Sequence, residues 1–427
     1  MEGRLTGTLE STGDKTSSFI VEEVPDKIDR RNDVAIMKHD NMFLNLAYFS
    51  AINLVKENDH ILDYISLQGP TPQPAFAKHL QFLQSGLTER QREAVTKALI
   101  NDRSIPTIIT GPAGTGKSLV LAEIGLQVAV SNRKVLYISP TNQGITNLYS
   151  TVRKLSEQHF QDKVRLLKLS SPAVQIGNDC DQCFRDDLGT NHRYPSLDEI
   201  NLRDVIFATP TVALRLGLLT EKRPDFGCIL IDELAYMTET EAICALAPFL
   251  KENREQNPKV VLAGDNKQLT YVPRSQAASL GGMTTDLMTR LMKLEVYNDD
   301  RYITHLVDNF RNDRLLISLL NHMIYENKIK CRTKTTSGKI VAVHTVSLFK
   351  RPINDTSAYN AVDAVTCLRL AQKERQEIPD KKVIILCLYK AQMALLTRLQ
   401  TNAPEEERID IVTAELVQGS QSDHVIL

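Results

Sequence analysis

Short apolar runs alternate with longer amphipathic runs through the middle of the chain, from residue 106 to about residue 269. The short runs are bounded by polar or turn-forming residues, as buried strands usually are. We expect strands at residues 107–110, 135–138, 205–208, 228–231 and 259–262, and helices at 119–130 and 146–155. Strands that alternate with helices are typical of a parallel sheet with helices on both faces. The pattern therefore predicts an α/β domain over residues 87–300.

The same alternation returns after residue 340. We expect strands at residues 341–345, 383–388 and 409–412, and helices at 361–376 and 391–400. A last apolar run, residues 425–427, has the character of a further core strand that is only beginning. The pattern therefore predicts a second α/β domain over residues 301–427, incomplete at its C-terminal side.

The N-terminal part of the chain differs from both domains. Residues 1–33 are polar and of mixed charge, so we expect one strand at 19–21 and partial disorder elsewhere. In residues 34–67 the apolar positions recur at helical spacing, until Gly69-Pro70-Thr71-Pro72 breaks the pattern. We expect one or two helices and a linker in the region 34–86.

A polar insertion, about residues 157–204, interrupts the first α/β domain and carries Cys180, Cys183 and His192. A structural zinc site needs four ligands, and no second Cys or His pair has matching spacing. We therefore favour a surface insertion over a metal site. The seven scattered cysteines argue for a reducing compartment and free thiols.

Charge and hydropathy narrow the choice of partners. The 51 basic and 52 acidic residues give a formal net charge of −1, so any nucleic-acid surface must be a local basic patch. The apolar runs are too short to cross a bilayer, and the N-terminus lacks the apolar stretch of a signal peptide. We expect a protein of the cytoplasm, or alternatively of the nucleus, without membrane contact.

The most specific motif follows the first predicted strand. The stretch Gly111-Pro112-Ala113-Gly114-Thr115-Gly116-Lys117-Ser118 has the spacing G-x-x-x-x-G-K-[ST] and is followed by a predicted helix. Such a turn aims backbone N–H groups and the positive end of a helix dipole at one point, where phosphate oxygens bind. Lys117 would reach the β- and γ-phosphates, and the Ser118 hydroxyl would bind Mg²⁺. A strand–helix turn without a ligand is the much weaker alternative.

Two acids end another predicted strand. In a phosphate-loop ATPase, an Asp at the place of Asp232 holds Mg²⁺, and a Glu at the place of Glu233 polarises the attacking water. An acidic pair after a strand is more often a helix cap, but the phosphate loop upstream favours the catalytic interpretation. Gln268 follows a further strand, where it could reach the γ-phosphate or the attacking water.

Two other polar residues have competing interpretations. Gln91 lies three residues after Thr88, which fits a capping box, but it could also read the edge of adenine. Arg311 alone would be a surface base, but its guanidinium could also stabilise the transferring γ-phosphoryl group.

The order of these motifs is itself informative. Eight elements follow one another along the chain: Gln91, the phosphate loop, Ser139-Pro140-Thr141-Asn142, Ala208-Thr209, Asp232-Glu233, Gly264-Asp265 with Gln268-Leu269, Asn309-Phe310-Arg311 and Val417-Gln418-Gly419. The chain from residue 87 onward resembles superfamily 1 helicases, most of all the branch of the nonsense-mediated-decay RNA helicase and its DNA-acting relatives. The helical region before residue 67 resembles, more weakly, the stalk of that branch.

The resemblance implies two RecA-like domains with ATP and Mg²⁺ between them and single-stranded RNA or DNA across the top. It implies that Gln91 contacts adenine, that Phe310 stacks on the base, and that Gly419 also belongs to the nucleotide site. The phosphate loop, Asp232, Glu233, Gln268 and Arg311 would bind and hydrolyse ATP. Residues that match positions along the nucleic-acid path are Pro140, Thr141, Asn142, Thr209 and Thr413. Such contacts are made to the backbone, so binding would be independent of sequence and sensitive to salt.

The sequence also departs from the family pattern. Tyr236 stands where the family has a Gln, and Gln421 stands where it has an acid. The motif with the second arginine finger is expected beyond Leu427, so we expect a chain truncated before it and an exposed edge in the second sheet. The alternative functions are a catalytically impaired module that binds nucleotide and nucleic acid, and, more weakly, a nucleotide kinase. We expect a monomer, with protein partners from an RNA-processing complex.

Overall fold

The computed structural model describes residues 6–11, 17–23, 42–67, 81–161, 163–169, 195–218, 223–271, 273, 276–281, 283–333, 341, 343, 349–351, 357–414 and 422–427. The chain divides into two units, residues 1–45 and 46–427. In the first unit, β1 (Thr6–Ser11) and β2 (Ser17–Glu23) form an antiparallel pair, so two strands form where the sequence predicts one.

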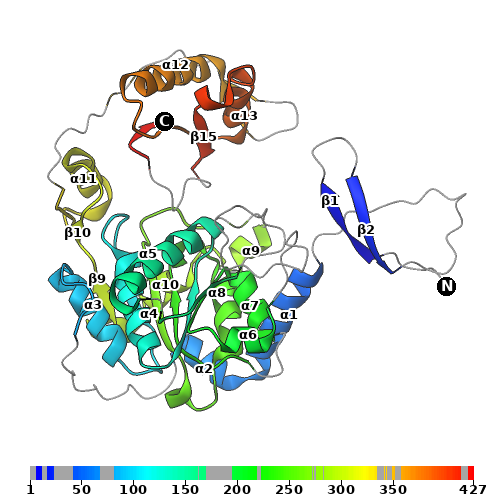
Figure 1. Cartoon of the computed structure of the whole chain (residues 1–427), viewed down its shortest axis with the longest axis vertical. Helices are drawn as coiled ribbons and strands as arrows, with labels where there is room; N and C mark the ends of the chain where they lie inside the picture. Colours follow the sequence, from blue (N-terminus) through cyan, green and yellow to red (C-terminus); the bar gives the residue numbers. More distant parts are fainter. Residues whose placement is uncertain are drawn as a thin grey trace, which may run out of the picture. The chain divides into compact units, whose positions relative to one another are not determined.

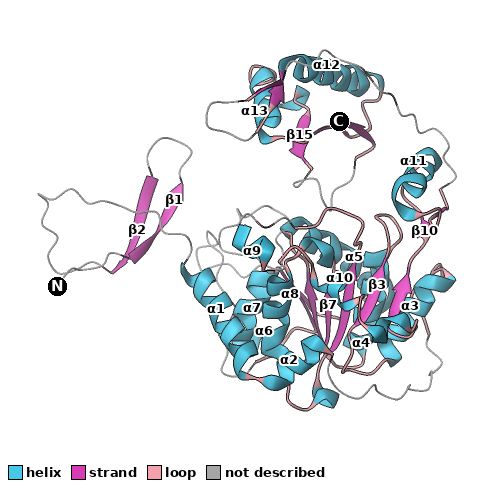
Figure 2. Cartoon of the chain, turned by 180° about the vertical axis from the view of Figure 1, so that it is seen from behind, coloured by secondary structure: helices cyan, strands magenta, loops and turns pink. Residues whose placement is uncertain are grey.

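A seven-stranded sheet organises the second unit (Figures 1 and 2). Its order is β5-β6-β4-β7-β8-β3-β9, and all of its strand pairs are parallel. The strands are β3 (Thr107–Thr110), β4 (Lys134–Ile138), β5 (Leu166–Lys168), β6 (Val205–Ala208), β7 (Phe226–Ile231), β8 (Lys259–Gly264) and β9 (Ile303–His305). The α/β class with parallel strands is therefore confirmed.

Helices cover both faces of this sheet (Figure 2). One layer consists of α3 (Glu89–Ile100), α4 (Lys117–Val130) and α5 (Asn142–Phe160). The opposite layer includes α2 (Asp59–Ser66), α6 (Leu197–Asn201), α7 (Pro210–Leu218), α8 (Glu239–Leu246) and α10 (Leu287–Leu291). Helix α1 (Met42–Glu57) packs its Ala47 and Ala51 against Leu214 of α7 and Cys244 of α8. The short helix α9 (Gln276–Leu280) completes the helices of this region.

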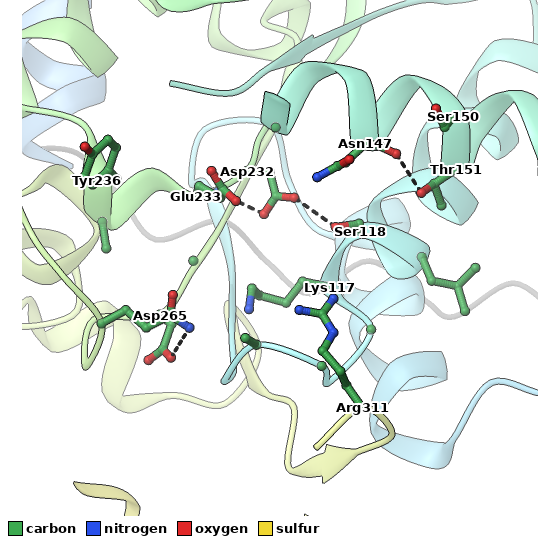
Figure 3. A pocket seen from close by; sticks show the side chains of 18 residues that line it. Lys117, Ser118, Asn147, Ser150, Thr151, Asp232, Glu233, Tyr236, Asp265 and Arg311 are labelled. Atoms are coloured by element: carbon green, nitrogen blue, oxygen red, sulfur yellow. Dashed lines mark hydrogen bonds between the residues drawn. The ribbon is translucent and has the colours of Figure 1, made fainter. Parts of the chain in front are cut away.

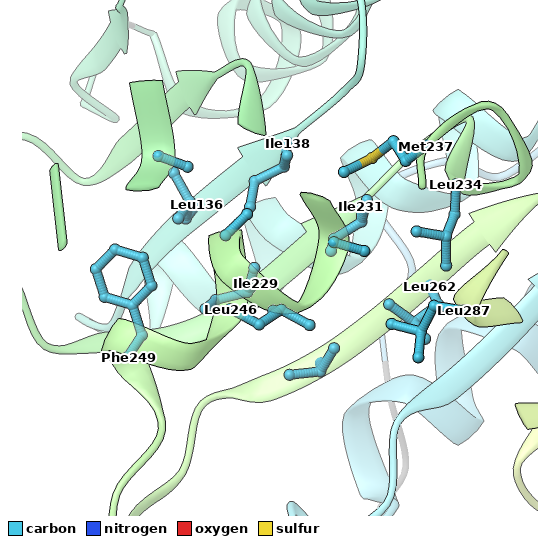
Figure 4. Packing of buried hydrophobic residues seen from close by; sticks show 14 of the residues in the cluster. Leu136, Ile138, Ile229, Ile231, Leu234, Met237, Leu246, Phe249, Leu262 and Leu287 are labelled. Atoms are coloured by element: carbon cyan, nitrogen blue, oxygen red, sulfur yellow. The ribbon is translucent and has the colours of Figure 1, made fainter. Parts of the chain in front are cut away.

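Alternate residues of each strand enter opposite cores, because successive side chains of a strand point to opposite faces. Leu136 and Ile138 belong to one core, whereas Val135 and Tyr137 belong to the other. Figure 4 shows the first core, where Leu136, Ile138 and neighbouring strand residues pack against Leu246 and Phe249. Since both faces are covered, the inner residues of β4, β6, β7 and β8 are apolar in succession, without the polar–apolar alternation of a half-exposed strand.

The strand β9 extends the first sheet beyond residue 300, where the sequence pattern ends the first domain. After β9 come β10 (Asp308–Asn309), α11 (Arg314–Leu320), a π-helical turn η5 (Asn321–Tyr325) and β11 (Lys330–Cys331). Strands β10 and β11 pair with each other in parallel. The 3₁₀ turns are η1 (Leu234–Tyr236), η2 (Ala247–Phe249), η3 (Arg254–Gln256), η4 (Glu295–Asn298) and η6 (Glu405–Glu407).

The C-terminal part contains a three-stranded parallel sheet of order β15-β14-β16. It consists of β14 (Val383–Cys387), β15 (Asp410–Thr413) and β16 (His424–Ile426), with helices α12 (Ala361–Glu377) and α13 (Lys390–Leu399). A short antiparallel pair, β12 (Phe349–Lys350) and β13 (Tyr359–Asn360), precedes them. The predicted strand at 341–345 lies mostly outside the described residues, which contain only 341 and 343 of it. The apolar end of the chain does form a strand, and Val425 pairs with Ile384.

Candidate nucleotide-binding and hydrolysis site

The phosphate loop connects β3 directly to α4, as the motif predicts. Gly114 and Gly116 have φ values of 87° and 84°, a backbone region that side chains disfavour. A Cβ atom on Gly116 would lie 2.4 Å from Nε2 of Gln91, and one on Gly114 would lie 2.6 Å from Cβ of Arg311. Glycine is therefore required at both positions for conformation and for space.

Lys117 is the first residue of α4 and folds back over the loop. Its ammonium group donates to the carbonyl oxygens of Gly111 at 2.6 Å and Pro112 at 3.1 Å. Burial lowers the pKa of Lys117, while the carboxylates of Asp232, Asp265 and Glu233 act in the opposite direction. The cation lies among these acids at the mouth of the loop, where a phosphate group would meet it (Figure 3).

Ser118 and Asp232 make the contact between loop and sheet. The Ser118 hydroxyl donates to Oδ2 of Asp232 at 3.1 Å, and the backbone N–H of Glu233 donates to Oδ1 at 2.9 Å. Burial raises the pKa of Asp232, and Lys117 counters that effect. A hydroxyl and a carboxylate are oxygen donors of the kind Mg²⁺ prefers, with phosphates and water completing its shell. The residues present therefore fit a magnesium ion.

Glu233 has a strained backbone conformation and a buried carboxylate oxygen, and both cost free energy of folding. Its φ of 54° is left-handed, which is uncommon for a residue with a side chain. Its Oε2 atom is buried and has no hydrogen-bond partner among the described residues. Burial and the neighbouring Asp232 raise the pKa of Glu233 to about 7. A strained carboxylate with a pKa near neutrality has the properties of a general base.

Arg311 belongs to the segment after β9, the strand that pairs with β3 beside the phosphate loop. Asn309 donates from Nδ2 to the Ala113 carbonyl at 2.7 Å and accepts at Oδ1 from the N–H of Arg311. The N–H of Phe310 donates to the Gly114 carbonyl at 2.9 Å. Burial lowers the pKa of Arg311, which nevertheless stays charged. The chain segment after β9 is thus fastened to the phosphate loop and places the guanidinium beside Lys117 (Figure 3).

A single cavity of about 620 Å³ brings most of the predicted catalytic residues together. From the prediction it includes Ala113, Gly114, Gly116, Lys117, Ser118, Asp232, Glu233, Gln268 and Arg311. Gly111, Pro112 and Thr115 form the buried base of the same loop, and the Thr115 hydroxyl donates to the Pro112 carbonyl at 2.8 Å. Phe310 lies next to Arg311 and is 49% exposed.

Gln91 lies under the phosphate loop. Its Nε2 donates to the Thr115 carbonyl at 3.0 Å, and its Oε1 accepts from the N–H of Thr88 at 2.9 Å. The capping box with Thr88 is complete, and the Gln91 side chain is buried. The structure thus supports the capping interpretation and adds a contact to the loop, while the predicted adenine contact remains a prediction.

The predicted nucleic-acid residues occupy two places. Pro140, Thr141 and Asn142 follow β4, and Thr209 follows β6, which is paired with β4. All four therefore lie at the same edge of the sheet as the phosphate loop. The Thr141 hydroxyl caps α5 by accepting from the N–H of Gly144 at 2.9 Å.

The remaining predicted residues lie elsewhere. Thr413 ends β15, where it is buried with no partner for its hydroxyl among the described residues. Gly419 and its neighbours Gln418 and Gln421 fall outside the described residues, as do Cys180, Cys183 and His192.

The cavity also contains residues that the sequence analysis missed. Asn147, Ser150 and Thr151 of α5 line it, and Figure 3 shows Asn147 and Thr151 on the side of the helix toward Ser118. Their spacing of three and four residues places them on one side of a helix, which is the only signal the sequence offers. Asp265 and Tyr236 line the same cavity. A smaller neighbouring cavity shares Leu119, Ser150 and Thr151 with it.

This fold and site define a phosphate-loop nucleotide-binding protein built on a RecA-like α/β sheet. Two family models, both described as AAA domain, match residues 86–314 and 283–427. The chain belongs to this family and, within it, to the superfamily 1 helicases of the nonsense-mediated-decay branch.

Three relatives illustrate the match. MOV-10 of Gallus gallus is 29% identical over 57% of this chain and 26% of its own length. The DNA-binding protein SMUBP-2 of Rattus norvegicus is 29% identical over 67% of this chain and 33% of its own. The DNA replication ATP-dependent helicase/nuclease DNA2 of Gallus gallus is 23% identical over 80% of this chain and 32% of its own. The chain thus spans about a third or less of the length of these relatives.

Proposed function

We propose that this protein hydrolyses ATP and uses the reaction to move along or unwind single-stranded RNA or DNA. The observation that carries the proposal is the convergence of Lys117, Asp232 and Arg311 on one cavity, from segments far apart in the sequence. Family membership and the presence of a complete phosphate loop support it.

Each residue has a distinct task in the proposed reaction. Lys117 and Arg311 neutralise charge that develops on the γ-phosphoryl oxygens. Glu233 accepts the proton of the attacking water, because its raised pKa makes it a better base than an ordinary carboxylate. Ser118 and Asp232 would hold Mg²⁺, which would supply positive charge to the phosphates when bound.

The track is proposed to bind at the edge formed by Pro140, Thr141, Asn142 and Thr209. This edge lies at the carboxyl ends of β4 and β6, where open α/β sheets bind their ligands. The names of two relatives mention DNA, whereas the family branch also contains an RNA helicase, so both tracks belong in the test. In the described residues, no helix is both long and apolar enough to cross a membrane.

The test is steady-state ATP hydrolysis by the 427-residue chain, alone and with single-stranded RNA or DNA. Stimulation by one strand type, lost in Glu233→Gln, is the expected result and identifies the track. A Glu233→Gln protein that hydrolyses ATP as fast as the parent protein would overturn the assignment of the base.

The second candidate is a catalytically impaired module that binds nucleotide and nucleic acid. Tyr236 favours it, because this residue lines the cavity at the position where the family has a Gln. For this candidate, Mg·ATP binding persists and Lys117→Ala removes it, but no strand stimulates hydrolysis. Tyr236→Gln separates the two functions, because a gain of hydrolysis in that variant would identify Tyr236 as the cause of the impairment.

A further inference from the structure

Asp265 accepts hydrogen bonds from two side chains in different parts of the chain, those of Gln268 and Tyr325. Its Oδ2 atom accepts one hydrogen bond from Nε2 of Gln268 at 2.9 Å and another from the Tyr325 hydroxyl at 2.7 Å. Its Oδ1 accepts from the N–H of Lys267 at 3.1 Å. Asp265 is buried, follows β8 and lines the catalytic cavity (Figure 3). The carboxylate is therefore a shared acceptor between Gln268 and a distant tyrosine.

The backbone around Tyr325 is unusual. Tyr325 is the last residue of the π-helical turn η5, and the next two residues, Glu326 and Asn327, have φ values of 53° and 61°. Short π-helical turns are rare and occur often at functional sites, and left-handed residues with side chains cost energy. The side chain of Asn321 fastens this turn by hydrogen bonds to the backbone of Ile329 at 2.8 and 3.0 Å.

The segment 306–333, which contains Tyr325, also makes hydrogen bonds to the phosphate loop near its N-terminal end. The N–H of Leu306 donates to the Thr110 carbonyl at 2.7 Å, and the N–H of Phe310 donates to the Gly114 carbonyl. Arg311 lies directly after this attachment (Figure 1, β10 and α11). Residues 306–333 therefore contact the phosphate loop near Arg311 and contact the Gln268 loop through Tyr325.

The chemistry of the contact fixes the orientation of Gln268. An ionised carboxylate only accepts hydrogen bonds, so the amide end of Gln268 must face Asp265. Burial and Asp265 raise the pKa of the Tyr325 phenol far above neutrality, so its hydroxyl stays a donor. Loss of this donor would leave Asp265 less constrained and would let the carboxamide of Gln268 rotate.

We propose that Tyr325 is a positioning residue that acts through Asp265 to orient Gln268 toward the γ-phosphate, and so couples this sensor to the segment that carries Arg311. The inference rests on the proposed function, since it assigns a role within the same site. It adds a residue that no sequence motif singles out and that does not itself line the cavity, which it contacts only through Asp265.

The experiment is a double-mutant cycle of Tyr325→Phe and Gln268→Ala, with the track that stimulates the parent protein. A hydrogen bond to a charged group is strong enough that Tyr325→Phe should lower kcat about tenfold, with KM for ATP changed less than about twofold. In the Gln268→Ala background, Tyr325→Phe should lower kcat by less than about twofold, because Tyr325 affects catalysis only through Gln268, which is then already absent. Multiplicative effects of the two substitutions would overturn the inference.

Tyr297→Phe is the matched control. It removes a buried tyrosine hydroxyl that donates to the Pro106 carbonyl at 2.8 Å, away from the cavity. We expect a lower melting temperature and an unchanged kcat for this variant. A loss of kcat in Tyr297→Phe as large as in Tyr325→Phe would mean that general destabilisation causes both, and would overturn the inference.

A binding measurement covers the case of a chain that does not hydrolyse ATP. The ratio of affinities for a fluorescent non-hydrolysable ATP analogue and for the matching ADP analogue reports γ-phosphate sensing. Tyr325→Phe and Gln268→Ala should lower this ratio to a similar extent. If the parent protein binds nucleotide but Tyr325→Phe leaves the ratio unchanged, only the inference fails. If the parent protein binds no nucleotide, the proposed function fails, and the inference with it.

Discussion

The Ser118 hydroxyl donates a 3.1 Å hydrogen bond to Oδ2 of Asp232, which lies 114 residues further along the chain. Ser118 is on the first turn of α4, and Asp232 follows β7. Strand β8 lies between β7 and β3, so the sheet brings the two residues together across a neighbouring strand. A hydroxyl beside a buried carboxylate at the mouth of a phosphate loop is the arrangement that a magnesium–nucleotide complex requires.

Lys117→Ala should abolish nucleotide binding. The ammonium group is the cation nearest to the phosphate position, and its removal leaves Asp232 and Glu233 without their main counter-charge. We expect ATP hydrolysis to fall by roughly 10³-fold or more, as for other groups that stabilise phosphoryl charge. Binding of a fluorescent ATP analogue measures the effect. Lys163→Ala, an exposed lysine outside the site, is the control and should leave binding unchanged.

Glu233→Gln should separate binding from hydrolysis. The amide keeps the size of the side chain but cannot accept the proton of water, so hydrolysis should fall by at least roughly 10²-fold. Nucleotide affinity should be retained or increased, because Asp232 then no longer faces a second negative charge. Hydrolysis and binding are measured on the same preparation. Loss of both together would indicate a structural rather than a catalytic role.

The pH dependence of ATP hydrolysis should reflect the ionisation of Glu233. Its pKa is raised to about 7 in the folded chain, so the fraction that is ionised and able to act as a base increases through that pH. We therefore expect kcat/KM to rise with pH up to about 7 and then to level off, since this parameter reports the free enzyme. A flat profile between pH 5.5 and 8, on the order of one unit either side of that pKa, would contradict the assignment.

The raised pKa of Glu233 also predicts how the stability of the folded protein depends on pH. A carboxyl group with a raised pKa in the folded state binds more protons there than in the unfolded chain. Its contribution to stability is complete below the unfolded pKa and is lost as the pH rises through about 7. The melting temperature should therefore fall less steeply over this range in Glu233→Gln than in the parent protein.

Gln91→Ala distinguishes support of the phosphate loop from recognition of adenine. The substitution removes the hydrogen bonds to Thr88 and Thr115 and should lower stability by about 1–2 kcal/mol. If the support interpretation holds, affinities for ATP and GTP should fall by the same factor. A loss confined to ATP would favour the adenine contact. Gln91→Glu keeps the acceptor for Thr88 but loses the donor to Thr115, and so isolates the contact to the loop.

Much of the first domain could be predicted from the sequence because its signals are local. The strands predicted at 107–110 and 205–208 match β3 and β6, and the one at 135–138 lies within β4. The strand at 19–21 lies within β2, but its partner β1 was not predicted, because Leu9 is its one large apolar residue. The strand β9 was missed for a related reason, since a short edge strand contains few apolar residues.

The sequence by itself determined the phosphate loop, the order of the motifs and the helical and strand periods, because each depends on neighbouring residues. Only the tertiary structure decided that Arg311 lies beside the loop, that Gln91 supports it from below, and that Tyr325 contacts Asp265. Those relationships join residues that are distant in the chain. They depend on the order of strands in a parallel sheet and on the path of the segment after β9, which the local composition of the chain does not encode.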